Sequence, residues 1–213
     1  TCVFEDRTEA GSLLAEKLRN IAGLYGKKAV LAIPAGGVPV GFTIAKSLKI
    51  PFYVFIVRKI QIPWNSEAGF GALSLDGTIL LNDDIIRHLG LTSTEIEECI
   101  EKTRKAVEER AKPFGAKMLP QNFRDKMIIL VDDGLASGFT MLTAIKAVRK
   151  HNPQKVVIAT PTASLSAIEI LKSEADIIIC LNIRGGPIFA VADAYKRWYD
   201  LSDEEVATYL SKI

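Results

Sequence analysis

Residues Ile128–Thr140 read IILVDDGLASGFT, and this stretch does most to decide the fold class. Its first four residues are apolar, as expected for a strand that is covered on both faces of a parallel sheet. Asp132 and Asp133 follow this strand, and small residues then lead into a segment with helical periodicity. A strand, a small-residue loop and a helix in this order predict one unit of an α/β sheet, with a ligand at the strand's carboxyl end.

The rest of the chain repeats this alternation. Short apolar runs bounded by turn residues predict strands over Ala29–Ile33, Phe52–Val57, Met127–Val131, Val156–Thr160 and Ile177–Leu181. Helical periodicity predicts helices over Glu9–Leu24 (with an apolar stripe of Leu13, Leu14, Leu18 and Ile21), Val38–Leu48, Ser93–Lys112, Thr140–Lys150 and Leu165–Lys172. We therefore predict an α/β fold, a doubly wound and mostly parallel sheet of five core strands, in a single domain over residues 1–213.

Two regions depart from this alternation. Residues 60–82 are rich in glycine, aspartate and proline, and they predict a mobile loop followed by an antiparallel hairpin with Asp76-Gly77 as its tight turn. Residues 183–213 begin with an irregular Arg-Gly-Gly-Pro stretch and end in a helix near Ser202–Ser211, where Ser202 and Glu205 fit a capping box.

Composition excludes several classes of protein. The net charge is only +2 with 24% charged residues, which gives no nucleic-acid-binding surface. No apolar run reaches the roughly 18–20 residues that span a bilayer, and the first residues do not read as a signal peptide. Cys2, Cys99 and Cys180 are far apart and odd in number, so we expect free thiols in the cytoplasm. His88 and His151 have no partner at metal-ligand spacing.

The loop after the Asp132-Asp133 pair has the chemistry of a sugar-phosphate site. Small residues let successive backbone N–H groups approach a ligand, and the N–H groups at a helix start suit a phosphate dianion. The hydroxyls of Ser137 and Thr140 add two donors. The two carboxylates lie upstream, where they can accept hydrogen bonds from the vicinal hydroxyls of a sugar. The plainer alternative is that the two aspartates only cap a turn before a helix.

This arrangement resembles the signature of type I phosphoribosyltransferases that binds phosphoribosyl pyrophosphate (PRPP). The resemblance implies that Asp132 and Asp133 hold the ribose 2- and 3-hydroxyls as the catalytic acidic pair. It implies that the 5-phosphate is bound by Ala136, Ser137, Gly138, Phe139 and Thr140. Ser137 stands where the family often has threonine. Phe139 stands where the family usually has a small residue, and it adds bulk beside the phosphate.

The stretch Pro34-Ala35-Gly36-Gly37 follows the first predicted strand and resembles the pyrophosphate loop of the same family. In that loop a peptide, often with a non-proline cis bond, turns its N–H groups toward the pyrophosphate. The resemblance therefore assigns Ala35 and Gly36 to pyrophosphate binding. Many relatives have arginine at Ala35, so this half of the site carries less positive charge here. An ordinary glycine-rich strand-to-helix turn is the alternative.

Arg58 and Lys59 end the second predicted strand. Two cations that leave a buried strand toward the ligand edge can neutralise pyrophosphate oxygens. The family has a basic residue here with this role, and we prefer Lys59 to Arg58. A solvated pair of charges at a strand exit is an equally good explanation from sequence.

The stretch Pro63–Gly71, PWNSEAGFG, corresponds to a flexible loop that closes over the reacting sugar in relatives. Glu67 is its one carboxylate, and it would assist closure of this lid or the metal. Closure would exclude water from a cation-like sugar centre. The alternative is a plain surface loop.

The family resemblance covers nearly the whole chain and predicts a transferase that moves ribose 5-phosphate from PRPP to a nucleobase-type acceptor. It implies Mg²⁺ bound with PRPP, no direct protein ligand for the metal, and a homodimer. The C-terminal segment 183–213 resembles the small hood of the family, which usually holds the base. The sequence does not identify the base, because the aromatic residues of this segment fit packing better than base stacking; they are Phe189, Tyr195, Trp198 and Tyr199. A PRPP or nucleotide sensor without transfer activity remains the alternative, and a Mg²⁺-dependent phosphatase ranks last.

Overall fold

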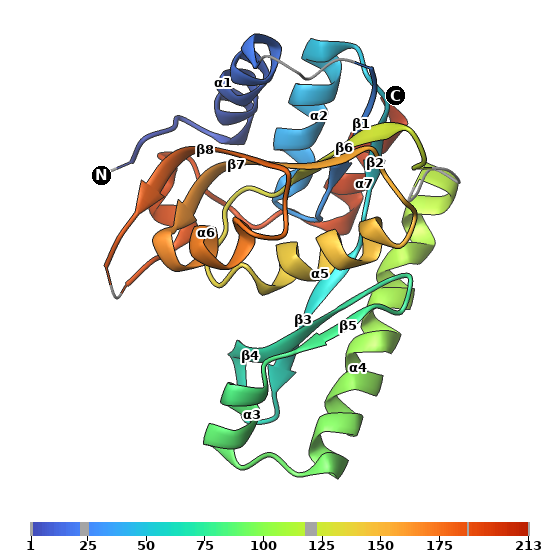
Figure 1. The fold of residues 1–213 in the computed structure, drawn as a ribbon, viewed down its shortest axis with the longest axis vertical. Helices are drawn as coiled ribbons and strands as arrows, with labels where there is room; N and C mark the ends of the chain where they lie inside the picture. Colours follow the sequence, from blue (N-terminus) through green and yellow to red (C-terminus); the bar gives the residue numbers. More distant parts are fainter. Residues whose placement is uncertain (1, 22–25, 118–122, 187, 213) are drawn as a thin grey trace.

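The computed structural model describes residues 2–21, 26–117, 123–186 and 188–212 of the chain. Its centre is a parallel sheet of five strands in the order β2-β1-β6-β7-β8 (Figure 1). The strands are β1 (Lys27–Ala32), β2 (Phe52–Val54), β6 (Lys126–Val131), β7 (Lys155–Ser164) and β8 (Ile177–Arg184). The predicted doubly wound sheet of five core strands is therefore confirmed.

Helices cover both faces of this sheet, as Figure 1 shows. One face packs against α1 (Arg7–Asn20), α2 (Gly37–Leu48) and α7 (Asp203–Ser211), and the other against α5 (Phe139–Arg149) and α6 (Leu165–Leu171). Successive side chains of a strand point to opposite faces. Val30 of β1 accordingly belongs to the core under α1 and α2, while Leu31 belongs to the core under α5. Burial on both faces explains the unbroken apolar runs of the sequence.

The first helix differs from its prediction of Glu9–Leu24. α1 begins at Arg7, because the Asp6 carboxylate caps it by accepting hydrogen bonds of 2.9 Å from two backbone N–H groups of the first turn. Leu24 lies outside the described residues. Within the predicted stripe, Leu14 is fully buried but Leu13 is 41% exposed, so Leu13 does not belong to the core.

The predicted strand Phe52–Val57 is wrong in one respect. β2 ends at Val54, and Val57 begins β3 of a second sheet. Phe55 and Ile56, which join the two strands, are 1% and 0% exposed. The segment that crosses between the two sheets is therefore as apolar as the strands that it joins. For this reason the sequence predicted one continuous strand.

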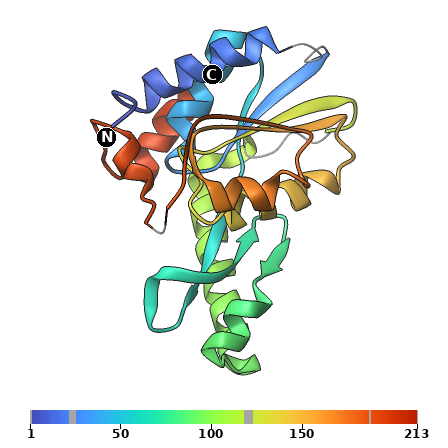
Figure 2. The same ribbon diagram turned by 60° about the vertical axis from the view of Figure 1, so that its left-hand side comes forward.

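The second sheet is antiparallel and contains β3 (Val57–Ile62), β4 (Asn65–Ser74) and β5 (Ile79–Leu81). With α3 (Asp83–Leu89) and α4 (Ser93–Ala111) it forms a limb that extends away from the main sheet (Figures 1 and 2). The loop predicted over Pro63–Gly71 is wrong, since β4 begins at Asn65. Glycine in this stretch serves close packing of strands: a Cβ on Gly71 would lie 2.5 Å from the Leu80 carbonyl oxygen.

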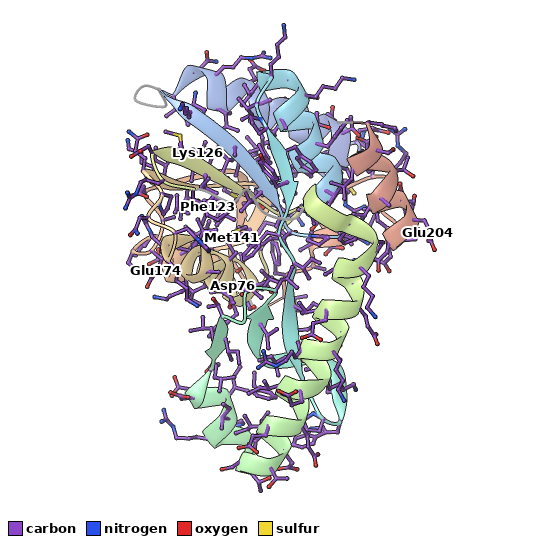
Figure 3. All side chains as sticks on the ribbon, turned by 90° about the vertical axis from the view of Figure 1, so that its right-hand side faces the viewer. Asp76, Phe123, Lys126, Met141, Glu174 and Glu204 are labelled. Carbon is purple, nitrogen blue, oxygen red and sulfur yellow. The ribbon has the colours of Figure 1, made fainter. Side chains whose placement is uncertain are left out.

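The turn between β4 and β5 is confirmed at Asp76-Gly77, with a φ of 83° at Gly77. This turn also fastens the limb to the main body, near the position labelled Asp76 in Figure 3. Lys150, at the end of α5, donates a 2.6 Å hydrogen bond to the Thr78 hydroxyl and lies 3.7 Å from the Asp76 carboxylate. The limb is therefore attached at a turn that is itself ordered by side-chain contacts.

The chain's N-terminal and C-terminal segments meet over the carboxyl edge of the main sheet. After β8, the short helix η2 (Val191–Ala194) leads into a strap that contacts residues before α1. The backbone N–H groups of Val3 and Phe4 both donate to the Ala194 carbonyl, at 2.8 and 2.9 Å. The capping box of Ser202 and Glu205 at the start of α7 is confirmed. A 3-10 helix, η1 (Lys112–Lys117), follows α4. Over the described ranges, no helix combines the length and apolarity needed to cross a membrane.

The contrast between Leu13 and Leu14 gives a test of the packing of α1. We expect Leu14→Ala to lower the free energy of unfolding by about 2–5 kcal/mol, because it leaves a cavity in the core. Leu13→Ala, one residue away on the exposed side, should change it by less than about 0.5 kcal/mol. Urea denaturation of both variants measures the difference. Equal effects would contradict this packing of α1.

Candidate functional site

The site lies where the strand order reverses. β1 leads to β2 on one side and β6 leads to β7 on the other, while β1 and β6 pair with each other in parallel. Their last residues, Ala32 and Val131, are in register, and the Ile33 N–H donates to the Val131 carbonyl at 2.8 Å. The loops that follow both strands therefore leave side by side, as the sequence predicted. Such a reversal is where open α/β sheets bind ligands.

The two loops are in direct contact. A Cβ on Gly36 would lie 1.8 Å from the Asp133 carboxylate oxygen Oδ2, and one on Gly37 would lie 2.6 Å from the Val131 carbonyl oxygen. Neither position has room for a side chain. The Pro34–Ala35 peptide bond is cis, as the family resemblance implied. Glycine at Gly36 and Gly37 thus allows the Pro34–Gly37 loop to lie against the acidic pair.

The two aspartates occupy different environments. Asp133 is 8% exposed, whereas Asp132 is only partly buried and its Oδ1 accepts a 2.9 Å hydrogen bond from the Asp133 N–H. Burial raises the pKa of the Asp132 carboxyl well above its ordinary value, and the charge of Asp133 raises it further. Burial also raises the pKa of Asp133, but the guanidinium of Arg7 opposes that effect.

Arg7 is a site residue that sequence reasoning missed. Its Nε donates to Asp133 Oδ2 at 2.8 Å across 126 residues of sequence, and both side chains are buried. A weak signal was present, because Arg7 is the first residue of α1. The positive end of the helix dipole disfavours a cation at a helix start, so a compensating anion is expected nearby.

The aromatic residues of the C-terminal segment differ in exposure, since some are packed in the core and others lie on the surface. Tyr195 is 3% exposed and donates a 2.5 Å hydrogen bond from its hydroxyl to the Asp133 carbonyl oxygen. Its ring packs between Phe4 and Trp198, with centroids 5.7 and 5.3 Å away. Tyr195 therefore packs against the acidic pair, in agreement with the interpretation that packing fits it better than base stacking. Tyr199 remains 55% exposed.

The predicted 5-phosphate loop is exposed at Ala136 and Ser137 and leads into α5 at Phe139, one residue before the predicted helix start. Gly138 caps the helix with a φ of 78°, which glycine adopts without strain. The loop is held from below by β7, whose Ser164 hydroxyl donates to the Ala136 carbonyl at 2.6 Å. The loop is thus supported by the sheet while Ala136 and Ser137 remain exposed.

A cavity of about 480 Å³ opens beside this loop, and Lys59 forms part of its wall. Its walls combine polar groups with apolar side chains; the residues that shape it include Lys59, Phe70, Asn82, Ile85, Ser137, Phe139 and Thr140. The stem of Lys59 passes over Gly69, where a Cβ would come within 2.3 Å of Lys59 Cγ. The structure therefore brings Lys59, which belongs to the limb, together with the predicted 5-phosphate loop of the main body.

Arg58 is placed differently from Lys59. It lines a hollow of about 290 Å³ on the α4 side, which Lys59 also borders. Burial lowers the pKa of Arg58, and the charge of Arg110 on α4 lowers it further. Of the two cations that sequence had grouped, Lys59 thus borders both hollows, whereas Arg58 borders the one on the α4 side. Glu67 lies in β4, and its side chain is outside the described part of the structure.

Comparison with known proteins agrees with this geometry. The model of the phosphoribosyl transferase domain family matches residues 7–194. The chain belongs to the phosphoribosyl transferase family. The match includes Arg7 and both loops of the site, and it ends one residue before Tyr195.

The relatives of this phosphoribosyl transferase domain include two Mycobacterium tuberculosis sequences named provisionally as phosphoribosyl transferases. They are 35% identical over 212 residues, which are 99% of this chain and 47% of the relatives. The chain thus spans about half the length of these relatives. A uracil phosphoribosyltransferase of Mycoplasma genitalium is 25% identical over 83% of this chain and 79% of its own length. The crystal structure of the protein TT1426 from Thermus thermophilus has a TM-score of 0.78 and 31% identity, over 99% of this chain and 98% of that one.

A metal centre of protein ligands is absent from the described part of this transferase domain. No group of three or more histidine, cysteine, aspartate or glutamate side chains there could hold a metal ion. The acidic pair supplies two carboxylates, and one of them is already bound by Arg7.

The contact between Gly36 and Asp133 gives a second test. We expect Gly36→Ala to destabilise the domain by about 1–3 kcal/mol, because the new methyl overlaps a buried carboxylate that cannot move away. Gly185→Ala is the matched control, since nothing lies within 4 Å of a Cβ there. Thermal unfolding of both variants measures the effect. An unchanged melting temperature for Gly36→Ala would show that the two loops are further apart.

Proposed function

We propose that this domain transfers ribose 5-phosphate from PRPP to a nucleobase-type acceptor and releases pyrophosphate. The observation that carries this proposal is the contact of two loops at the strand-order reversal. One loop supplies an acidic pair and a helix start, and the other supplies a backbone turn at Ala35 and Gly36. A substrate with a phosphate at one end, a pyrophosphate at the other and a diol between them suits this arrangement.

Binding would follow the charges of the site. The N–H groups at the start of α5, with the hydroxyls of Ser137 and Thr140, would hold the 5-phosphate. The acidic pair would accept hydrogen bonds from the ribose hydroxyls. Ala35, Gly36 and a cation of β3, Lys59 in preference to Arg58, would bind the pyrophosphate. Mg²⁺ that arrives with PRPP would neutralise charge on the pyrophosphate oxygens.

Catalysis would consist of orientation and charge placement. As the bond between C1 and the pyrophosphate oxygen lengthens, the sugar becomes oxocarbenium-like and a ring nitrogen of the acceptor attacks it. Fixed groups aimed at the developing charges lower the barrier without a covalent intermediate. The apolar walls of the cavity, Phe70, Ile85 and Phe139, would exclude water and suit a flat ring. Phe139, which the sequence assigned to the 5-phosphate loop as added bulk, would form part of this apolar wall.

A second candidate is a module that binds PRPP or a nucleotide without transfer. One observation favours it: Ala35 stands where many relatives have arginine, so the Pro34–Gly37 loop itself brings no cation to the pyrophosphate. Less positive charge on the leaving group would slow bond cleavage while leaving the sugar-phosphate half of the site intact.

Asp132→Asn tests the assignment of the acidic pair. The amide can still accept the Asp133 N–H bond, but it loses the negative charge that would bind the ribose hydroxyls. We expect PRPP affinity to fall by about 10- to 100-fold, the worth of a hydrogen bond to a charged group. Isothermal titration with Mg²⁺-PRPP measures this. Asp84→Asn, at an exposed ion pair on α3, is the control that should bind normally. Unchanged affinity for Asp132→Asn would remove this residue from the site.

Pyrophosphate release distinguishes the two candidate functions. We expect release from Mg²⁺-PRPP to rise above the base-free rate with at least one member of a panel of purines and pyrimidines. The control is the Asp132→Asn variant with the same bases. PRPP binding without release for any base would favour the binding module, and absence of PRPP binding would contradict both candidates.

A further inference from the structure

The Asp133 carboxylate is the meeting point of three segments that are distant in sequence. Arg7 reaches it from the first turn of α1, and Tyr195 holds its backbone carbonyl from the C-terminal strap. The loop glycine Gly36 lies directly against its oxygen Oδ2. Because Asp133 is enclosed from these sides, its carboxylate is oriented toward protein and away from the open part of the site.

The side chain of Arg7 is held by contacts with the C-terminal strap as well as by Asp133. Its guanidinium carbon lies 3.9 Å from the centroid of the Trp198 ring, within the range of a cation–π contact. One terminal nitrogen donates to the Tyr199 carbonyl at 2.9 Å, and the residue is 6% exposed. The contact with Trp198 and the hydrogen bond to Tyr199 therefore hold the guanidinium of Arg7 against the Asp133 carboxylate.

We propose that Arg7 is a positioning residue that holds Asp133 as an inward-directed carboxylate and leaves Asp132 as the acceptor for the ribose hydroxyls. The inference rests on the proposed function, since it concerns how the same acidic pair is prepared for PRPP. It gives the two aspartates different roles, which the family resemblance had treated as one.

The physical reason is that burying two adjacent negative carboxylates is unfavourable. The groups that face Asp133 are Asp132 from its own loop, Arg7 from α1 and Tyr195 from the strap. Arg7 is the one cation among them, and it opposes the burial that raises the pKa of Asp133. Arg7 also opposes the rise in the pKa of Asp132, so its loss would raise the pKa of both carboxyls further, and a shared proton would then occupy a lone pair that a ribose hydroxyl needs up to a higher pH.

The test is the pH dependence of Mg²⁺-PRPP binding by Arg7→Gln. Loss of Arg7 removes the cation that lowers the pKa of both carboxyls, so as the pH falls binding should be lost at a higher pH than in wild type, and it should return above that pH. We expect affinity about 10-fold below wild type near neutral pH, with recovery toward wild type as the pH rises. Arg7→Lys keeps the charge and should show a smaller loss and a weaker pH dependence.

Arg197→Gln is the matched control. Arg197 also ties the strap to the residues before α1, through Asp6 at 2.7 Å and Glu5 at 3.4 Å, but it does not touch the acidic pair. Its variant should show the pH profile of the wild type. Wild type measured alongside corrects for the titration of PRPP itself.

The double variant Arg7→Gln/Asp133→Asn separates the roles of the two aspartates. It removes the buried charge together with its counter-charge, which proteins tolerate better than removing one partner. We expect PRPP affinity to recover to within about 3-fold of wild type, without the pH dependence of Arg7→Gln. A double variant that binds no better than Arg7→Gln would show that Asp133 itself holds the ribose, and would overturn the proposal.

Two further outcomes are decisive. If Arg7→Gln weakens binding by the same factor at every pH, Arg7 acts only in folding and the proposal is wrong. If Arg7→Gln does not fold, as judged by circular dichroism, Arg7→Lys and the double variant still test the pH dependence and the division of roles. Wild-type protein that fails to bind PRPP would instead contradict the proposed function.

Discussion

The parallel pairing of β1 with β6 is the contact on which the rest of the site depends. Six residue pairs join the strands, and the pairing ends with Ala32 beside Val131. Each strand therefore releases its loop at the same level of the same edge. A register shift of one residue would move every side chain of a strand to the opposite face of the sheet and so into the other core, and the packing of both cores therefore fixes this alignment. The loops meet because the hydrophobic core has already set the strands, and glycine at Gly36 and Gly37 lets them approach.

Charge burial then links the acidic pair to the ends of the chain. A carboxylate as enclosed as Asp133 needs a counter-charge, and the cation that pairs with it comes from outside the main sheet. Arg7 comes from the start of α1, and Trp198 and Tyr199 come from the C-terminal strap. The hydrogen bonds of Val3 and Phe4 to Ala194 bring these two segments together. The strap is therefore part of the electrostatic support of the site as well as a cover over it.

The antiparallel limb makes a different contribution. Its strands carry Lys59 to the cavity beside Ser137 and Thr140, while Arg58 faces α4. The limb is attached to the main body at the Asp76–Thr78 turn by Lys150 of α5. Since α5 begins at the predicted phosphate loop and ends at this turn, one helix joins the sugar-phosphate half of the site to the element that supplies its cation. This coupling is a consequence of the second sheet, which the alternation of strands and helices along the rest of the chain does not predict.

The sequence by itself determined the five-stranded parallel core, the paired loops at Pro34–Gly37 and Asp132–Thr140, and the tight turn at Asp76-Gly77. These features depend on local patterns: apolar runs, small residues at strand ends and turn residues with positive φ. Tertiary structure alone decided the crossing of Phe55 and Ile56 between sheets, the strand in place of a loop after Trp64, and the separation of Lys59 from Arg58. It also decided the role of Arg7, because an ion pair between residues 126 positions apart leaves no periodic trace in the sequence. Only folding brings the cation and the carboxylate into one buried place, where the low polarity makes their pairing necessary.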